Sequence, residues 1–273
     1  MKFVKMHGAG NDFIIVNNMS GTIPEKEYSA LAAGYCARRT SIGADGFMVV
    51  VPSEKADFRM IFFNSDGSMG EMCGNGARCI ARYGHDYGLA GDIQHIEVTA
   101  GIVVGERISR TEYRVKLNDP TVLDPHRTVN LPEGSFDCGY VELGDPGLPH
   151  GILLKDDWDR IPENELRELG RKLRFASEFP KGANFSFAKI LGDNELKAVT
   201  FERGVEDFTL ACGTGCGSIA SILSLRGLCH PGDVTIHMPG GTLSISLNME
   251  GNTIKDIYLT GPTCVVCEGE TVD

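Results

Sequence analysis

Residues 72–78 read Met-Cys-Gly-Asn-Gly-Ala-Arg, and residues 211–217 read Ala-Cys-Gly-Thr-Gly-Cys-Gly. Each stretch places one cysteine, Cys73 or Cys212, directly before a Gly-x-Gly triplet. The two cysteines are separated by about half of the 273-residue chain. The repetition predicts two similar halves, each contributing one thiol to a shared site.

Each cysteine precedes a segment with helical character, at residues 76–83 and 216–223. In the second segment Ile219, Ile222 and Leu223 have the spacing of one helical face. A helix N-terminus presents unpaired N–H groups and the positive end of the helix dipole. It can bind a carboxylate, and it can lower a cysteine pKa from about 8.5 into roughly the 3.5–7.5 range. We therefore expect a reactive thiol beside an anion-binding turn in each half.

Three other interpretations of these stretches remain open. A single Cys-Gly-x-Gly is also typical of a buried structural cysteine in a tight turn. A zinc site would use Cys73, Cys79, Cys212 and Cys216, although their spacings differ from those of a zinc knuckle. A nucleotide-binding loop is the weakest, because neither stretch completes G-x-G-x-x-G or G-K-[ST].

The composition is that of a globular protein, with a net charge of −11 and a pI near 5.1. The acidic balance argues against a nucleic-acid partner. No apolar run reaches the roughly 18 residues of a membrane span, and the N-terminus does not resemble a signal peptide. We therefore expect a cytoplasmic protein with neither a membrane nor a nucleic-acid partner.

The chain contains nine cysteines, which we expect to be mostly free in a reducing compartment. Five of them occur in apolar or helical context and are predicted to be packing residues: Cys36, Cys138, Cys229, Cys264 and Cys267. The Cys-x-x-Cys at residues 264–267 has no second pair, so it is weak evidence for a metal.

The order of predicted elements repeats across a junction at Asn118-Asp119-Pro120, which divides the chain into halves 1–118 and 119–261. The fold class is therefore α+β with an internal pseudo-repeat. In the first half we expect strands at 3–6, 13–17, 47–51, 58–64, 95–99, 102–107 and 113–117, and helices at 24–38 and from the first cysteine to 87. In the second half we expect strands at 135–143, 151–154, 183–190, 196–201, 234–238, 243–247 and 254–259, and helices at 163–174 and from the second cysteine to about 227.

Four motifs in this order resemble those of the diaminopimelate epimerase family, which are cofactor-independent amino-acid epimerases. They are residues 5–13 (KMHGAGNDF), 63–68 with 72–79, 182–185 (GANF), and 201–204 with 212–215. The resemblance implies two pseudo-symmetric α/β domains, each with strands wrapped around a central helix. It also implies that residues 262–273 return to the N-terminal domain.

The resemblance further implies an isomerase that converts LL-diaminopimelate into meso-diaminopimelate, for lysine and cell-wall precursor synthesis. Such an enzyme takes a small amino-acid substrate, needs neither cofactor nor metal, and is expected to form a homodimer. Cys73 and Cys212 would be its two bases. The resemblance assigns substrate binding to Asn11, Asn64, Gly74, Asn75, Asn184, Glu202, Arg203, Gly213 and Thr214, and an orienting role to His150.

The chemistry is consistent with two opposed thiols, because inverting an α-carbon removes a proton from one face and returns one to the other. Arg203 is the best candidate for a distal carboxylate, since its planar guanidinium binds that group in two places. Two positions depart from the family pattern: Leu148 replaces an asparagine, and Phe208 an acidic residue. Leu148 favours the alternative of a related racemase for another amino acid, such as histidine. A thiol-based metal or redox binding protein is the alternative from another class.

Overall fold

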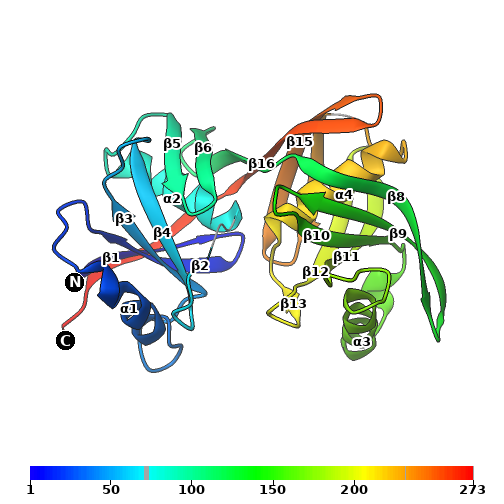
Figure 1. Cartoon of the computed structure of the whole chain (residues 1–273), viewed down its shortest axis with the longest axis horizontal. Coiled ribbons are helices and arrows are strands. Elements are labelled where there is room, and N and C mark those ends of the chain that lie inside the picture. The colour runs from blue at the N-terminus through cyan, green and yellow to red at the C-terminus, as the bar shows by residue number, and fades with distance from the viewer. Residues whose placement is uncertain (71–73, 231, 273) are drawn as a thin grey trace. The chain divides into compact units, whose positions relative to one another are not determined.

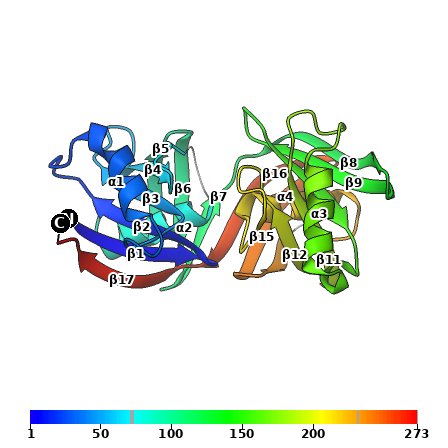
Figure 2. The ribbon, with the colours of Figure 1, turned by 90° about the horizontal axis from the view of Figure 1, so that it is seen from below.

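The computed structural model describes residues 1–70, 74–230 and 232–272. The chain forms two compact units, one made of Met1–Val115 with Gly261–Asp273, the other of Lys116–Thr260. The chain thus enters the second unit a few residues before Asn118 and leaves it one residue before the expected end at 261. In the first unit, β17 (Cys264–Glu270) pairs antiparallel with β1 (Lys2–Gly8) and runs alongside it in Figure 2.

Within its described residues, the first unit is an eight-stranded sheet with two α-helices. Its strands are hydrogen-bonded in the order β17-β1-β2-β3-β4-β5-β6-β7. The remaining elements are β2 (Asn11–Asn17), the 3-10 turn η1 (Glu25–Glu27), α1 (Tyr28–Tyr35), β3 (Gly46–Val51), β4 (Phe58–Asn64), α2 (Gly74–Asp86), β5 (Ile93–Val98), β6 (Gly101–Arg107) and β7 (Glu112–Lys116).

The second unit has the strand order β8-β9-β10-β11-β12-β14-β15-β16, with the short β13 beside β12. Its elements are β8 (Pro120–Leu131), β9 (Gly134–Leu143), β10 (Leu148–Leu154), η2 (Trp158–Arg160), α3 (Glu163–Arg174), β11 (Asn184–Gly192), β12 (Glu195–Phe201), β13 (Phe208–Thr209), α4 (Gly213–Leu225), β14 (Gly232–Met238), β15 (Gly241–Glu250) and β16 (Thr253–Pro262).

The two units repeat one topology. From β17 in the first and from β8 in the second, successive strand pairs are antiparallel, antiparallel, parallel, antiparallel, parallel, antiparallel and antiparallel. Each parallel pair is joined by a helical crossover: α1 and α2 in the first unit, α3 and α4 in the second. The predicted α+β fold with a pseudo-repeat is confirmed.

Each unit is built around one buried helix. In the first unit, α2 is buried from Gly74 to Gly84 and contacts β1, β2, β5 and β6. In the second, α4 lies against β8, β9, β10, β11 and β15 (Figure 1). Glycines let the strands approach α2 closely: a Cβ on Gly84 would lie 2.5 Å from Oε1 of Gln94 on β5. Such a helix is positioned by tertiary packing rather than by an amphipathic surface.

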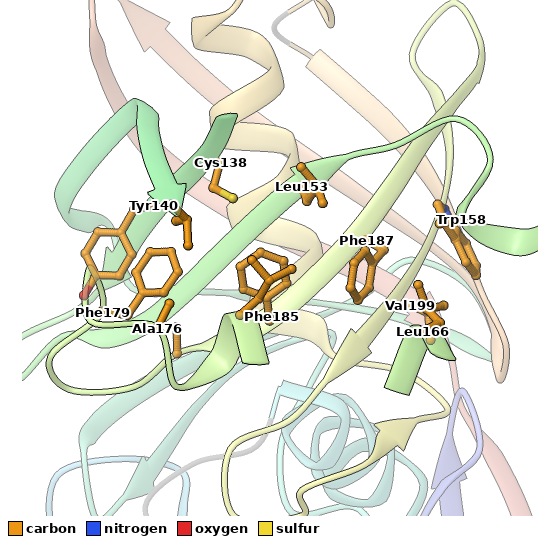
Figure 3. Close-up of a cluster of buried hydrophobic side chains, with 13 residues drawn as sticks. Cys138, Tyr140, Leu153, Trp158, Leu166, Ala176, Phe179, Phe185, Phe187 and Val199 are labelled. Carbon is orange, nitrogen blue, oxygen red and sulfur yellow. The ribbon is translucent and has the colours of Figure 1, made fainter. Parts of the chain in front are cut away.

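The outer helix α3 packs on a second layer of the core. Its residues Leu166 and Leu173 join a buried cluster with Phe179, Phe185 and Phe187. Figure 3 shows Phe179, Phe185 and Phe187 in a row, and the Phe179 ring stacks on Tyr140 with centroids 5.3 Å apart. This cluster supports the ends of β10, β11 and β12, from which several predicted site residues project.

The structure corrects three predictions. Cys264 and Cys267 are exposed rather than packed, because they lie on the edge strand β17. Strand β8 was not predicted, since Val129 is its only buried residue and its pairing is irregular between Asp124 and Arg127. The helix expected at 24–38 is a 3-10 turn followed by α1, which ends at Tyr35.

Candidate active site

In the first unit, a tight hairpin places Asn11 against the start of α2. The turn consists of Ala9 and Gly10, both with positive φ (51° and 87°). Strands β1 and β2 are therefore longer than the strands predicted at 3–6 and 13–17. At the end of β1, a Cβ on Gly8 would lie 3.0 Å from the backbone oxygen of Asn75. The hairpin therefore needs glycine at this position to contact the first turn of α2.

Asn75 is buried in that first turn, and its side-chain amide lies between two polar neighbours. Its Nδ2 lies 3.5 Å from Oδ1 of Asn11, and its Oδ1 accepts a 3.0 Å hydrogen bond from the guanidinium of Arg78. Gly74 is the first residue of α2. Cys73, the predicted first base, lies outside the described residues.

Asn64 lies at the end of β4 and is exposed. Its backbone N–H donates to the Ser68 oxygen at 2.8 Å, and its Nδ2 donates to Ser68 Oγ at 2.9 Å. The structure thus brings Asn11, Gly74 and Asn75 together, whereas Asn64 belongs to the neighbouring turn of the same unit.

In the second unit, the predicted residues gather where β10, β11 and β12 meet α4. His150 on β10 is the register partner of Asn184 on β11. The Asn184 side-chain oxygen accepts a 2.8 Å hydrogen bond from the backbone N–H of Arg203. Next along the chain, Glu202 accepts a 2.6 Å hydrogen bond from the Thr209 hydroxyl. The four predicted residues of these strand ends are therefore close neighbours.

Cys212 is the N-cap of α4, and its sulfur lies 3.6 Å from the hydroxyl of Thr214. Burial and the nearby Glu202 carboxylate raise the pKa of this thiol well above its ordinary value, although the Thr214 hydroxyl and the Gly215 N–H act in the opposite direction. The expected lowering of the Cys212 pKa by the helix N-terminus was wrong. Loss of solvent outweighs the hydrogen bonds from Thr214 and Gly215, so Cys212 rests as a thiol.

His150 is completely buried, and neither of its ring nitrogens has a hydrogen-bond partner among the described residues. Burial and the positive charge of Arg203 lower the His150 pKa to about 3. The imidazole is therefore neutral at physiological pH. A buried polar ring without a hydrogen-bond partner carries a desolvation cost.

The Arg203 guanidinium donates to the Lys181 carbonyl oxygen at 3.3 Å. The nearby acidic residues are otherwise engaged, since Asp207 pairs with Arg167 and Glu206 with Arg174. Within residues 1–70, 74–230 and 232–272, no carboxylate forms a salt bridge with Arg203. Its positive charge is therefore not neutralised by a carboxylate in this part of the chain.

The sequence did not single out Arg78 and Asp45 as site residues. Arg78 is fully buried and reaches back over the first turn of α2, and Asp45 accepts a 2.8 Å hydrogen bond from Asn11. The signal for Arg78 was its position three residues after Asn75, where side chains on one helical face meet. Asp45 gave no local signal, because it reaches Asn11 only through strand pairing.

The described residues contain no group of three His, Cys, Asp or Glu side chains that could hold a metal ion. Cys79 and Cys216, which the zinc interpretation requires, are both fully buried. None of the helices in the described ranges is long and apolar enough to cross a membrane.

Solved structures with the same fold define the class. A PhzF-family phenazine biosynthesis protein of Bacillus anthracis superposes with a TM-score of 0.74 at 14% identity, covering 100% of this chain and 99% of that one. A hydroxyproline epimerase of Agrobacterium vitis superposes with a TM-score of 0.71 at 14% identity, over 98% and 91% of the two chains. At such low identity the likeness establishes the fold alone, which is two repeated α/β units.

The sequence identifies the family. The family model for diaminopimelate epimerase matches residues 3–122 and 144–266. A diaminopimelate epimerase of Methanothrix thermoacetophila is 36% identical over 100% of this chain and 96% of that protein. One of Carboxydothermus hydrogenoformans is 36% identical over 99% of both. The chain belongs to the diaminopimelate epimerase family.

Proposed function

We propose that this protein epimerises LL-diaminopimelate to meso-diaminopimelate without a cofactor, using Cys73 and Cys212 as its two bases. The observation that carries the proposal is Cys212 at the N-terminus of the buried helix α4, in a chain matched over its length by diaminopimelate epimerases. Helix α2, which begins directly after Cys73, is the counterpart of α4 in the repeated topology.

In the proposed reaction, one cysteine removes the α-proton as a thiolate while the other returns a proton to the opposite face as a thiol. The raised pKa of Cys212 suits the proton-donating role in the resting enzyme. Cys73 would then act as the base that removes the α-proton from LL-diaminopimelate. The roles exchange in the reverse direction, because the product must be deprotonated from the other face.

The α-proton of an amino acid is weakly acidic, so the developing negative charge needs stabilisation. The N–H groups of Gly74 and Asn75 on α2, and of Gly213 and Thr214 on α4, would bind the α-carboxylate. Loss of one such donor typically lowers the rate about 10²- to 10³-fold. Exclusion of water from the site would strengthen the hydrogen bonds between these N–H groups and the carboxylate.

The remaining residues would recognise the rest of the substrate. Arg203, which has no salt bridge within the described residues, would bind the distal carboxylate through its planar guanidinium. Glu202 would accept a hydrogen bond from the substrate's ammonium group at the reacting centre. Asn11, Asn64 and Asn184 would hydrogen-bond the distal amino-acid end. His150, as a neutral imidazole, would orient the bound substrate.

One observation favours a second candidate, a racemase for a different amino acid. Phe13 pairs with Gly46 in the first unit, as His150 pairs with Asn184 in the second. Two residues before these positions lie Asn11 and Leu148, which are therefore counterparts in the repeat. The second unit offers an apolar side chain where the first offers an amide, which suits a substrate with a less polar distal end.

The test is α-proton exchange in deuterium oxide with thiol reductant present. LL- and meso-diaminopimelate are offered in parallel with a panel of amino acids that have one stereocentre. Exchange confined to diaminopimelate supports the epimerase, and exchange confined to another amino acid supports the racemase. No exchange with any amino acid would overturn both.

The proposal extends to the location, the cofactor requirement and the oligomeric state of the enzyme. The enzyme acts in the cytoplasm, works without pyridoxal phosphate and forms a homodimer. Full activity of protein without absorbance near 420 nm, roughly where pyridoxal enzymes absorb, tests the second property. Light scattering after size exclusion tests the third, and a mass near that of one 29.6 kDa chain would contradict it.

A further inference from the structure

We propose that Arg78 and Asp45 are positioning residues, which fix the orientation of the Asn75 and Asn11 side-chain amides through one directional chain of hydrogen bonds. The inference rests on the proposed function in one respect: Asn75 and Asn11 are taken to contact the substrate. The chain itself lies within the first unit and consists of described residues only.

The chain has three links. A guanidinium N–H of Arg78 donates to Asn75 Oδ1 at 3.0 Å. The Asn75 Nδ2 donates to Asn11 Oδ1 at 3.5 Å, which makes this the weakest link. The Asn11 Nδ2 donates to Asp45 Oδ2 at 2.8 Å. Every donor in the chain therefore points from the buried helix α2 toward the loop before β3.

The direction follows from the chemistry of the two ends. An arginine can only donate hydrogen bonds, and an ionised aspartate can only accept them. Each amide between them has one donating and one accepting side, whose assignment depends on the network. With Arg78 at one end and Asp45 at the other, only one orientation of each amide satisfies all three links. A single flip would face two donors or two acceptors against each other.

The donor end is held rigidly. Arg78 is completely buried, and its second guanidinium nitrogen lies 3.5 Å from the Gly74 carbonyl oxygen. A Cβ on Gly8 would lie 3.3 Å from this guanidinium, so the β1–β2 hairpin packs directly on it. The positive charge also lies beside the first turn of α2, where the proposed carboxylate would bind.

The acceptor end is held by a reciprocal pair of carboxylates. The Asp45 N–H donates to Asp12 Oδ1 at 2.9 Å, and the Asp12 N–H donates to Asp45 Oδ2 at 3.1 Å. Arg38 bridges both carboxylates at 2.7 and 2.8 Å, and Lys5 pairs with Asp12 at 3.1 Å. Burial acts to raise the Asp12 pKa, but Arg38 and Lys5 outweigh it and lower that pKa. These contacts hold Asp45 facing Asn11.

The consequence concerns which amide atoms a ligand meets. In the observed orientation the Asn75 NH₂ lies on the side of Asn11, and the Asn11 oxygen faces Asn75. Because the link between Asn75 and Asn11 is long, each end of the chain mainly fixes the amide next to it. If Asp45 were an amide, it could donate to Asn11 as well as accept from it, and only this 3.5 Å link would still orient the Asn11 amide. A fraction of the molecules would then present the wrong atom to the substrate.

The test combines side-chain amide NMR with kinetics, using Asp45→Asn and the pair Arg78→Met and Arg78→Lys. Controls of matched charge are Asp193→Asn and Arg110→Met, at exposed positions of the chain. In the wild type, Asn11 and Asn75 should each give one pair of side-chain N–H signals. Asp45→Asn should shift or split the Asn11 and Asn75 signals and lower kcat/KM at least about tenfold, without lowering Tm by more than a few degrees.

Arg78→Met should have the same effect, and Arg78→Lys should restore part of kcat/KM, because lysine also only donates. If Arg78→Met fails to fold, Asp45→Asn alone decides. Unchanged amide signals together with kcat/KM within twofold of wild type in Asp45→Asn would overturn the inference. The NMR readout needs no turnover, so it remains decisive even if the wild type exchanges no amino acid and the proposed function fails.

Discussion

The backbone N–H of Arg203 donates a 2.8 Å hydrogen bond to the side-chain oxygen of Asn184. The bond joins the start of β11 to the turn that follows β12, so it fixes the position of Arg203 relative to the sheet. It also fixes the Asn184 amide, whose oxygen is engaged and whose NH₂ must lie on the other side. One side chain thus supports the loop and presents a donor.

These two roles can be separated by substitution. Asn184→Asp keeps the acceptor for the Arg203 N–H and removes the donor, whereas Asn184→Ala removes both. We expect both variants to lower kcat/KM about 10- to 100-fold, the effect of losing a hydrogen bond to a charged group. Only Asn184→Ala should also lower Tm by several degrees. Equal melting temperatures of the two variants would show that the bond to Arg203 does not support the loop.

Cys212→Ala is expected to abolish epimerisation while leaving Tm within a few degrees of wild type, and Cys73→Ala should do the same. Full turnover by either variant would refute the two-base proposal.

Since Cys212 is buried and protonated, iodoacetamide at pH 7.5 should modify it more slowly than the exposed Cys264 and Cys267. Peptide mapping by mass spectrometry against time measures all three rates.

Two helical glycines provide a matched test of packing. A Cβ on Gly84 in α2 would lie 2.5 Å from Gln94 Oε1 and 2.6 Å from the Phe58 ring, whereas a Cβ on Gly34 in α1 meets nothing within 4 Å. Gly84→Ala should destabilise the protein by about 1–3 kcal/mol through overpacking. Gly34→Ala should stabilise it by up to about 1 kcal/mol, because alanine is the better helix former. Urea unfolding compares the variants, and equal midpoints would contradict the close packing around α2.

Buried thiols should make the protein less stable in alkali. Burial, together with Asp137, raises the pKa of Cys138 from 9.0 to about 12. Above pH 9 the unfolded chain releases this proton while the folded chain keeps it. The free energy of unfolding therefore falls as the pH rises from 9 toward 12.

The measurement is the change in the free energy of unfolding between pH 8 and pH 10, compared in wild type and Cys138→Ala. The variant should lose about 1 kcal/mol less over this interval. Its lower stability at both pH values, caused by the small cavity, does not affect the difference. An identical change in both proteins would mean that Cys138 ionises normally in the folded state.

The sequence predicted elements best where a local pattern coincides with burial. Strand β4 (Phe58–Asn64) and helix α3 (Glu163–Arg174) have the predicted bounds. Strand β8 was missed because it lies at a sheet edge, where the alternation of apolar and polar residues is weak. Phe208 departs from the family motif, which commonly has an acidic residue at this position. In the structure its ring packs edge-on against Phe187 and Phe201. Phe187 and Phe201 lie on the separate strands β11 and β12, so no local sequence pattern shows these contacts.

The fold class, the repeat and the family follow from the amino-acid sequence, because periodicity, turn residues and the order of motifs are local properties of the chain. The thiol state of Cys212, the unpaired ring of His150 and the exposure of Cys264 follow only from the tertiary structure. They depend on which distant groups exclude water from a side chain or surround it with charge. The same reason explains Asp45 and Arg78, whose effect on Asn11 and Asn75 exists only once the hairpin, the loop before β3 and helix α2 have come together.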